Sequence, residues 1–300
     1  MTITIHLVGG LGNQMFQYAF GTALAQHYQT NLAFDDSWYG RLPAGDTSRQ
    51  MDLRGLKISN TQFITPQKEA FSFVKSMRLK KLLQSFLPSG PVIHREKNGF
   101  VFDSSVFALN SAKTQNHFFI GYWQAFNYID TIRAQLQSEF QPRTGLNQHY
   151  QYYRSLMQSS PAAMVHVRRG DYVHLPAAAQ FHGVLSLNYY LAGMRLILER
   201  EPNTHFFLFS DDLPWCKENF PQEFKITYIE RNEAADSAAQ EIDLMTYCKH
   251  FIIANSSFSW WGAWLRKNVD GLVIAPNRWI ADTTLDLSDL LPANWKKLPT

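Results

Sequence analysis

The sequence predicts an α/β protein with two Rossmann-like domains and parallel sheets. Short apolar runs typical of buried strands alternate with segments whose apolar residues recur at helical spacing, in both halves of the chain. Several of these runs end in glycine or polar turns, as strands do where a sheet binds ligands. The 300 residues suffice for two domains of about 150 residues each. Two such domains, with their sheets facing each other, would place a ligand cleft between them at the carboxyl ends of the strands.

We expect the first domain to span residues 1–145. Apolar residues alternate over 3–8, a glycine turn follows at 9–12, and Met15 to Leu24 have helical spacing, which predicts strand, turn and helix. Further elements are expected as strands at 32–34 and 118–122 and as a helix at 127–140. The pattern is weaker between residues 39 and 111.

The second domain is expected to span residues 146–300. Its strands are predicted at 162–167, 206–209, 226–229, 251–254 and 272–274, and its helices at 188–199, 241–248 and 257–266. Strands that alternate with helices in this way are typical of a parallel sheet covered on both faces.

Composition excludes several classes of protein. The chain has 28 basic and 25 acidic residues, a net charge of +3 that is too weak for a nucleic-acid binder. Its two cysteines, Cys216 and Cys248, cannot form a disulfide scaffold or a zinc site and are expected as buried, reduced thiols. No apolar run is long enough to span a membrane, and the first residues lack the basic start of a secretion signal, so we expect a cytoplasmic protein. The aromatic content of 14% fits either core packing or sugar stacking.

The glycine turn carries Asn13 and Gln14 at the start of its helix. A dinucleotide fingerprint requires glycine at position 15, where this chain has Met15, so the turn gives little support to NAD binding. The need for positive φ explains the glycines, and Asn13 would be a good helix cap. A structural and a functional role are equal alternatives here.

A buried strand carries His166 and ends in Arg168, Arg169, Gly170 and Asp171. The planar guanidinium suits phosphate and carboxylate groups. Because neighbouring strand residues point to opposite sides, one of the two arginines is expected to face the ligand. The alternative is a salt bridge from Asp171 that holds the turn, and His166 by itself is typical of a core histidine.

Asp211 and Asp212 follow the next strand along the chain. They could bind a metal, a ribose hydroxyl or a base edge, or they could cap the helix that begins near Pro214. Since the sequence has no second carboxylate cluster of similar quality, a metal site is not expected.

A surplus of small polar residues begins the helix at 257–266. One cap would suffice, so the surplus favours an anion held by the free N–H groups and dipole of the helix start. The polar residues are Asn255, Ser256, Ser257 and Ser259, and Trp260, Trp261 and Trp264 behind them are expected mainly in the core. Arg168 and this turn together predict a site for a diphosphate, such as that of a nucleotide sugar.

Four segments together resemble the bacterial α1,2-fucosyltransferases. They are Gly10–Ala19, His166–Tyr172, Phe209–Asp212 with Trp215–Cys216, and Asn255–Trp264, which occur in the order of that family. The resemblance runs from residue 10 to about residue 265, nearly the whole chain. The resemblance implies a fold of the GT-B type, GDP-fucose as the donor and the 2-hydroxyl of a terminal β-galactose as the acceptor. It also implies inversion at the fucose anomeric carbon, and neither a cofactor nor a metal.

The resemblance also implies roles for particular residues. Arg168 would contact the β-phosphate, the serine turn the diphosphate, and Asn13 the region of the pyrophosphate and reacting sugar. An acidic residue nine positions before His250 would contact guanine, which gives Glu241 where relatives usually have Asp, with Asp243 as the alternative. The expected donor site comprises Gly12, His166, Arg168, Asp211, Glu241, Asn255, Ser256, Ser257 and Ser259, and the expected catalytic residues are Arg168, Asn13 and Asp171, the last as base or as a partner of the arginines.

The acceptor side is expected in the first domain, on the aromatic faces of Trp38, Tyr39 and Trp123. A second hypothesis is a glycan-binding protein on a degenerate transferase fold, which the intact Arg168, Asn13 and serine turn disfavour. The expected partners are GDP-fucose and a β-galactoside, not nucleic acid, with peripheral contact at the inner face of the membrane as a further option.

Overall fold

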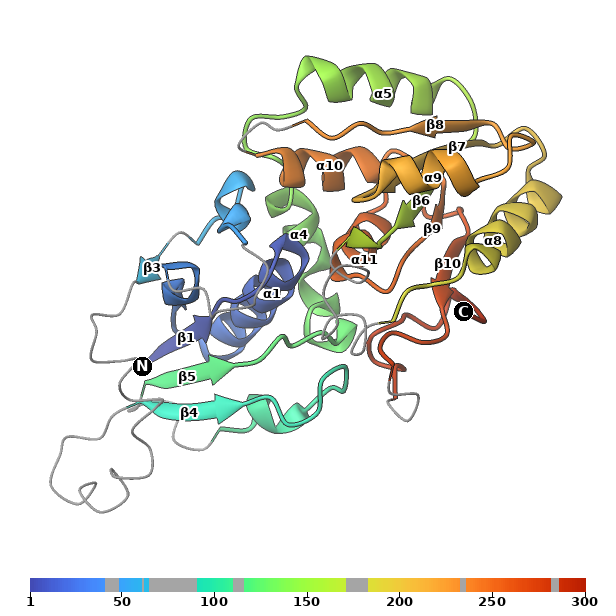
Figure 1. The fold of residues 1–300 in the computed structure, drawn as a ribbon. Helices are drawn as coiled ribbons and strands as arrows, with labels where there is room; N and C mark the ends of the chain where they lie inside the picture. Colours follow the sequence, from blue (N-terminus) through green and yellow to red (C-terminus); the bar gives the residue numbers. More distant parts are fainter. Residues whose placement is uncertain are drawn as a thin grey trace, which may run out of the picture. The chain divides into compact units, whose positions relative to one another are not determined.

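The computed structural model describes residues 1–40, 49–60, 62–64, 91–109, 116–170, 183–232, 236–281 and 286–300. They form two compact units, one of Met1–Met51 with Ile58–Leu136 and one of Asp52–Lys57 with Gln137–Thr300. Each unit contains one sheet, and all its pairings between strands are parallel (Figure 1). The predicted α/β class, with two Rossmann-like parallel sheets as in the GT-B type, is confirmed, whereas the cleft between the domains stays a prediction.

The first unit has a sheet with the strand order β3-β2-β1-β5-β4. Its centre is β1, where the alternating Ile3 and Ile5 are fully buried and α1 packs against the strand. The strands are β1 Thr2–His6, β2 Asn31–Asp35, β3 Phe63–Ile64, β4 Val92–Arg95 and β5 His117–Ile120, and the long helix is α1 Leu11–Tyr28. Short 3-10 helices occupy Ser37–Gly40, Ser104–Phe107, Phe126–Tyr128 and Asp130–Ile132, and α4 Arg133–Glu139 follows them.

Two predicted elements of this unit end differently in the structure. The expected strand at 118–122 stops at Ile120, because the Glu96 carboxylate accepts hydrogen bonds from the main-chain N–H groups of Tyr122 (2.7 Å) and Trp123 (3.0 Å). Trp123, the residue directly after the predicted strand, has a φ of 57°, a left-handed value that strand residues do not adopt. The expected helix at 127–140 is divided into two 3-10 turns and α4.

The second unit has a sheet with the strand order β11-β10-β9-β6-β7-β8. All six residues of β6 are buried, as the continuous apolar run predicts for a central parallel strand. The strands are β6 Ala162–Val167, β7 His205–Ser210, β8 Ile226–Tyr228, β9 His250–Ile252, β10 Val273–Pro276 and β11 Lys296–Leu298. The helices are α5 Gln148–Gln158, α8 Leu187–Arg200, α9 Leu213–Asn219, α10 Ser237–Met245 and α11 Ser257–Trp264, with a 3-10 helix at Asp52–Gly55. Helix α10 packs against α5 and α11.

The tryptophans of α11 are core residues, as predicted. Trp260, Trp261 and Trp264 are fully buried, and the Trp260 ring N–H donates to the carbonyl of Leu290 (2.7 Å). The two cysteines are buried and do not form a disulfide, which agrees with the expectation of reduced thiols. None of the helices in the described ranges is long and apolar enough to cross a membrane.

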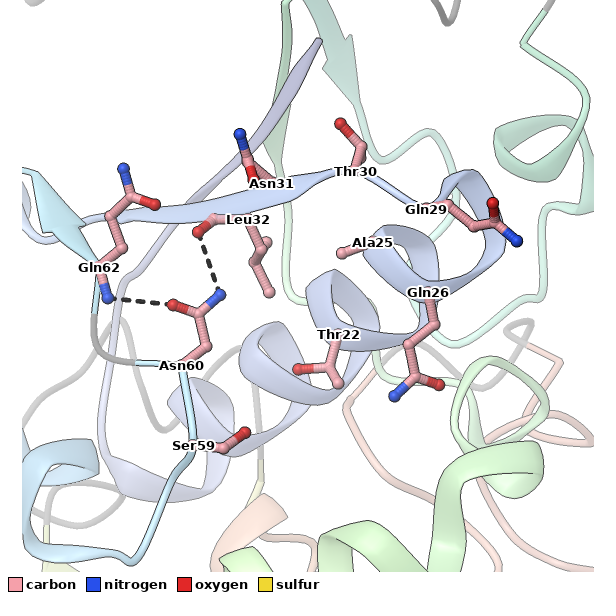
Figure 2. Close-up of a pocket in the computed structure, with 10 residues that line it drawn as sticks. All are labelled: Thr22, Ala25, Gln26, Gln29, Thr30, Asn31, Leu32, Ser59, Asn60 and Gln62. Atoms are coloured by element: carbon pink, nitrogen blue, oxygen red, sulfur yellow. Dashed lines mark hydrogen bonds between the residues drawn. The ribbon is translucent and has the colours of Figure 1, made fainter.

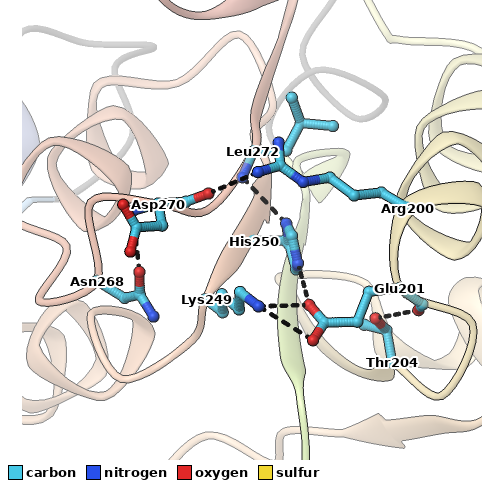
Figure 3. Close-up of polar contacts among 8 residues, drawn as sticks. All are labelled: Arg200, Glu201, Thr204, Lys249, His250, Asn268, Asp270 and Leu272. Carbon is cyan, nitrogen blue, oxygen red and sulfur yellow. Dashed lines mark hydrogen bonds and ion pairs between the residues drawn. The ribbon is translucent and has the colours of Figure 1, made fainter.

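A polar network closes the amino-terminal edge of this sheet (Figure 3). The Nδ1 atom of His250 accepts from the main-chain N–H of Leu272 (3.0 Å), so the ring carries its proton on Nε2 and donates it to Glu201 (2.8 Å). Lys249 pairs with the same carboxylate at 2.8 Å. Burial lowers the pKa of His250, which keeps the ring neutral in this arrangement. Lys249 and His250 therefore connect α8, β9 and the start of β10.

Candidate active site

The candidate site of the second unit lies where β9, β6 and β7 end. These three strands are neighbours in a parallel sheet, so their carboxyl ends share one edge. The polar segments that follow them are Asn255–Ser257, Arg168–Gly170 and Asp211–Asp212. Strand order alone therefore brings together three segments that are far apart in the sequence.

Arg168 and Asp211 form the central ion pair of this edge. The Arg168 Nη1 atom lies 2.8 Å from Asp211 Oδ2, and the other carboxylate oxygen accepts from the main-chain N–H of Arg169 at 2.9 Å. Burial alone would raise the pKa of Asp211, but the Arg168 charge and the N–H groups of Arg169 and Gly170 outweigh it and lower the pKa. A Cβ at Gly170 would lie 2.8 Å from the carboxylate, which explains the glycine. Asp211 is thus an ionised anchor for the Arg168 guanidinium.

The second arginine and the second carboxylate have other partners. Arg169 Nε lies 3.3 Å from Asp212, and its guanidinium lies over the Trp215 ring at 3.7 Å from the centroid. Asp212 is the N-cap of α9 and accepts from the main-chain N–H of Trp215 (3.2 Å). The helix-cap alternative is thus confirmed for Asp212, whereas Asp211 pairs with Arg168 and its contact with a ligand stays a prediction.

The polar residues at the start of α11 divide into two groups. Ser256 is the N-cap, and Ser256 and Ser257 are partly exposed at the helix start. Ser259 is fully buried and its hydroxyl donates to the carbonyl of Ser256 (3.3 Å), so it supports the turn. Asn255 is 2% exposed, and its amide donates to the carbonyls of Gly183 (3.2 Å) and Trp279 (3.1 Å). In this structure the Asn255 amide and the Ser259 hydroxyl therefore bond main-chain carbonyls and do not face an anion.

Glu241 of α10 belongs to the same polar cluster. Burial raises its pKa to about 7, Arg231 (3.8 Å away) opposes this shift, and the charges of Asp211 and Arg168 also act on it. Asp243 instead pairs with Lys267 at 3.4 Å. Residues two positions apart on a helix point to different faces. Glu241 therefore lies within the electrostatic influence of Arg168, whereas Asp243 faces Lys267.

His166 lies on β6 behind the arginines. It is 5% exposed, and burial lowers its pKa to about 4, so the ring is neutral at physiological pH. Its Nδ1 atom has no hydrogen-bond partner among the described residues, and Phe258 is its ring neighbour at 5.9 Å. This placement is that of a core histidine beneath the site. Asp171, the expected base or arginine partner, lies outside the described residues.

In the first unit, the glycine turn shapes the start of α1. Gly10 is the N-cap, so Asn13 is the third helical residue and not the cap that its residue type suggested. Gly9 has a φ of 80°, and a Cβ there would lie 2.6 Å from the Asn13 amide nitrogen. The Asn13 oxygen accepts from the side chain of Gln124 at 2.8 Å, and Gly12 is buried in the first turn. The turn therefore holds Asn13 at the carboxyl end of β1.

Two buried glutamines support this turn: Gln14, which the sequence analysis noted without a role, and Gln17, which it missed. Gln14 and Gln17 are fully buried, and their amides donate to the carbonyls of Gly9 (2.9 Å) and Gly121 (3.0 Å). Gln17 also accepts from the main-chain N–H of Val8 at 3.1 Å. Two glutamines on the apolar face of a helix were the available signal, because a buried amide must find hydrogen-bond partners.

The aromatic candidates for the acceptor differ in exposure. Trp123 is 2% exposed and stacks on Phe20, with ring centroids 4.2 Å apart, so it is a core residue and the expectation of a sugar-binding face is corrected. Trp38 and Tyr39 are partly exposed, with rings edge to face at 5.0 Å, and Tyr39 donates to the carbonyl of Gly9 (2.9 Å). This hydrogen bond holds the pair next to the glycine turn.

A fixed arginine and a capped helix start at the carboxyl edge of a parallel sheet, together with a buried acid on α10, make this part of an α/β protein a candidate site for an anion. Comparison with known proteins places the chain in a family: the model of glycosyl transferase family 11 matches residues 55–298, and the chain belongs to that family of α1,2-fucosyltransferases. The protein is therefore a glycosyltransferase.

Its relatives include two Escherichia coli proteins of nearly full-length similarity. The chain is 33% identical to an α-1,2-colitosyltransferase over 99% of this chain and 98% of the relative, and 32% identical to the O-antigen biosynthesis glycosyltransferase WbnK over 92% and 94%. The Bos taurus galactoside 2-α-L-fucosyltransferase SEC1 is 28% identical over 48% of this chain and 41% of the relative. Among solved structures, a mutant of Arabidopsis thaliana FUT1 in complex with GDP matches 91% of this chain and 69% of its own at 10% identity, with a TM-score of 0.48.

Proposed function

We propose that this glycosyltransferase moves L-fucose from GDP-fucose to the 2-hydroxyl of a terminal β-galactose, with inversion at the anomeric carbon. The observation that carries the proposal is the Arg168–Asp211 pair beside the start of α11, at the edge where β9, β6 and β7 end. A cation and a helix start at one sheet edge are what a nucleotide diphosphate requires. The galactoside acceptor is supported by the names of the mammalian relatives.

The geometry suits departure of a diphosphate. As the bond between the fucose anomeric carbon and the phosphate oxygen breaks, negative charge develops on the β-phosphate of GDP. Arg168 and the main-chain N–H groups at the start of α11 would stabilise this charge more in the transition state than in the ground state. Asp211 contributes by holding the guanidinium before the substrate arrives. The acceptor oxygen forms the new bond, and Asp171 is the proposed group for its proton.

The choice between fucose and colitose as the transferred sugar needs its own experiment. Colitose is fucose without the 3-hydroxyl, and one E. coli relative is named for colitose. A site that hydrogen-bonds a hydroxyl rejects the analogue lacking it by about 10⁴–10⁵, whereas an apolar pocket rejects an added hydroxyl by only about 10². We therefore expect kcat/KM for GDP-fucose to exceed that for GDP-colitose, and the reverse order would assign the donor to colitose.

The test of the whole proposal is GDP release from GDP-fucose by the purified protein, with and without lactose, N-acetyllactosamine and lacto-N-biose. Acceptor-dependent release and an α1,2-linked product are expected. The alternative, a glycan-binding protein without activity, predicts no turnover and no heat of GDP binding in calorimetry. Turnover is expected to survive EDTA, since we propose no metal, and fractionated cells should contain the protein in the cytoplasm or loosely attached to the inner membrane face.

The anchoring role of Asp211 predicts a graded loss of activity. In Asp211→Asn the ion pair to Arg168 is lost while the shape of the side chain remains, so the guanidinium can shift. Misplacement of a catalytic group by about 1 Å costs up to about 10² in rate, and we expect a fall in kcat of that order. Asp212→Asn is the matched control, because an Asn cap preserves α9 and should leave kcat within about threefold of the wild-type value.

The buried Glu241 predicts pH-dependent binding of GDP. Its pKa of about 7 means that the carboxylate, which accepts from the guanine N–H groups, forms as the pH rises through 7. GDP affinity in calorimetry should therefore increase by about tenfold from pH 6 to pH 8. In Glu241→Gln the residual dependence is that of GDP itself. Identical pH profiles for both proteins would show that Glu241 does not read guanine.

A further inference from the structure

A polar pocket lies at the edge of the first sheet opposite to Asn13 (Figure 2). Its volume is about 360 Å³, within the range of about 300–1,000 Å³ that is usual for ligand sites. The register pairs Asn31 with Thr2, which places the pocket where β1 and β2 begin. Asn13 and the pocket residue Gln26 are 13 positions apart on α1, which is about 20 Å along the helix axis. The pocket is therefore separate from the glycine turn.

The described lining of the pocket contains no charged side chain and no aromatic ring. Eight of its ten residues carry amides or hydroxyls, and the other two supply small apolar surfaces. The polar residues are Thr22, Gln26, Gln29, Thr30, Asn31, Ser59, Asn60 and Gln62, and the apolar ones are Ala25 and Leu32. Amide and hydroxyl groups can each donate and accept, which matches the hydroxyl groups of a neutral sugar. An ionic ligand would find no counter-charge in this lining.

One wall of the pocket is held in place by its own hydrogen bonds. The Asn60 side chain donates to the carbonyl of Leu32 (3.0 Å) and accepts from the main-chain N–H of Gln62 (3.0 Å). The main-chain N–H of Asn60 also bonds the Tyr18 hydroxyl at 3.3 Å. On the opposite wall, Gln26 donates to Gln135 at 2.5 Å. The wall that carries Asn60 is thus held in place before any ligand binds, which lowers the entropic cost of binding.

Thr22 points to a ligand by a second, independent observation. It is 6% exposed and lines the pocket, and its hydroxyl has no hydrogen-bond partner among the described residues. Figure 2 shows its oxygen directed toward the segment of Ser59 and Asn60. A buried hydroxyl without a hydrogen-bond partner destabilises the folded state. The oxygen itself is covered in the unliganded structure, so a ligand hydroxyl would become its partner after a small shift of the neighbouring side chains.

We propose that this pocket is a second carbohydrate site, which takes one or two neutral pyranose rings away from the catalytic edge. Such a site would hold a further part of a glycan chain, and it does not depend on which sugar the enzyme transfers. Free binding of a short saccharide to such a small site is expected to be weak, on the order of millimolar.

Amide-resolved NMR titration without any donor tests the proposal. The probes are lactose, maltose and N,N′-diacetylchitobiose, with glucuronate against glucose as a charged comparison. At least one disaccharide is expected to give saturable shifts confined to residues 22–32 and 59–62 beyond any shifts near Asn13, and glucuronate should bind more weakly than glucose. Absence of shifts in these segments with all three disaccharides, or preference for glucuronate, would overturn the proposal. Neither result depends on turnover, so the proposed transferase function stands or falls separately.

Variants separate a ligand role of Thr22 from a packing role. Thr22→Val keeps the shape and removes the buried hydroxyl, so its stability should equal or exceed that of the wild type. The proposal predicts that it binds the saccharide about fivefold more weakly, as loss of one hydrogen bond implies. Thr4→Val makes the same exchange on β1 outside the lining and should bind normally. Equal saccharide affinity in Thr22→Val and Thr4→Val contradicts the assignment.

Discussion

Replacing Arg168 with alanine is expected to lower kcat with GDP-fucose by about 10²–10³. The estimate follows from the loss of one pre-positioned donor to an oxyanion, because charge grows on the β-phosphate as the sugar leaves. The Asp211 carboxylate 2.8 Å away holds the guanidinium in position, so under the proposed function Arg168 is in place for the β-phosphate before the substrate binds. Single-turnover kinetics with GDP-fucose and lactose measure the effect on the chemical step.

Two controls distinguish this role from a loss of folding. Arg168→Lys keeps the charge but not the planar fork, and we expect it to recover part of the lost rate. Arg169→Gln removes the guanidinium that stacks on Trp215 and contacts Asp212, so it should affect stability more than kcat. If Arg169→Gln lowers kcat as strongly as Arg168→Ala in folded protein, the assignment of the two arginines is reversed.

Gly271→Ala is expected to destabilise the second unit by about 3 kcal/mol or more, since it forces extra volume into a packed backbone. A Cβ at this position would overlap the carbonyl of Lys249. Neither backbone segment can move away easily, because both are held by hydrogen bonds. The main-chain N–H of Lys249 donates to the carbonyl of Ala162 (2.8 Å), and that of Leu272 donates to Nδ1 of His250 (3.0 Å). Figure 3 shows the polar contacts around this edge of the sheet.

Urea and thermal unfolding of the purified variants measure this effect. For a unit of this size, about 3 kcal/mol corresponds to a fall in Tm of roughly 6–12 °C. Gly99→Ala is the matched control, because nothing lies within 4 Å of its added Cβ. It should be unchanged or up to about 1 kcal/mol more stable. A Gly271→Ala protein as stable as this control would mean that the backbone relaxes without cost.

Local sequence patterns predicted most elements of the second unit. The strand of β6 and the helices α8 and α11 appear within one or two residues of their predicted bounds, because each has a long run with one clear periodicity. The edge strand β11 was missed, since its three residues Lys296–Leu298 are too few and too polar to show a pattern. In the first unit, β3 and β4 were missed because they are short strands in the weakly patterned stretch.

The sequence by itself determined the chemistry at the strand ends, namely two arginines, two carboxylates and a run of small polar residues. Only the tertiary structure decided that Asp211 anchors Arg168 while Asp212 caps a helix, that Ser259 is buried, and that Trp123 stacks within the core. Periodicity depends on neighbours a few residues apart and is visible in the chain. Partners far apart in the sequence, such as Arg168 and Asp211, meet only because β6 and β7 are adjacent in register, which local pattern does not encode.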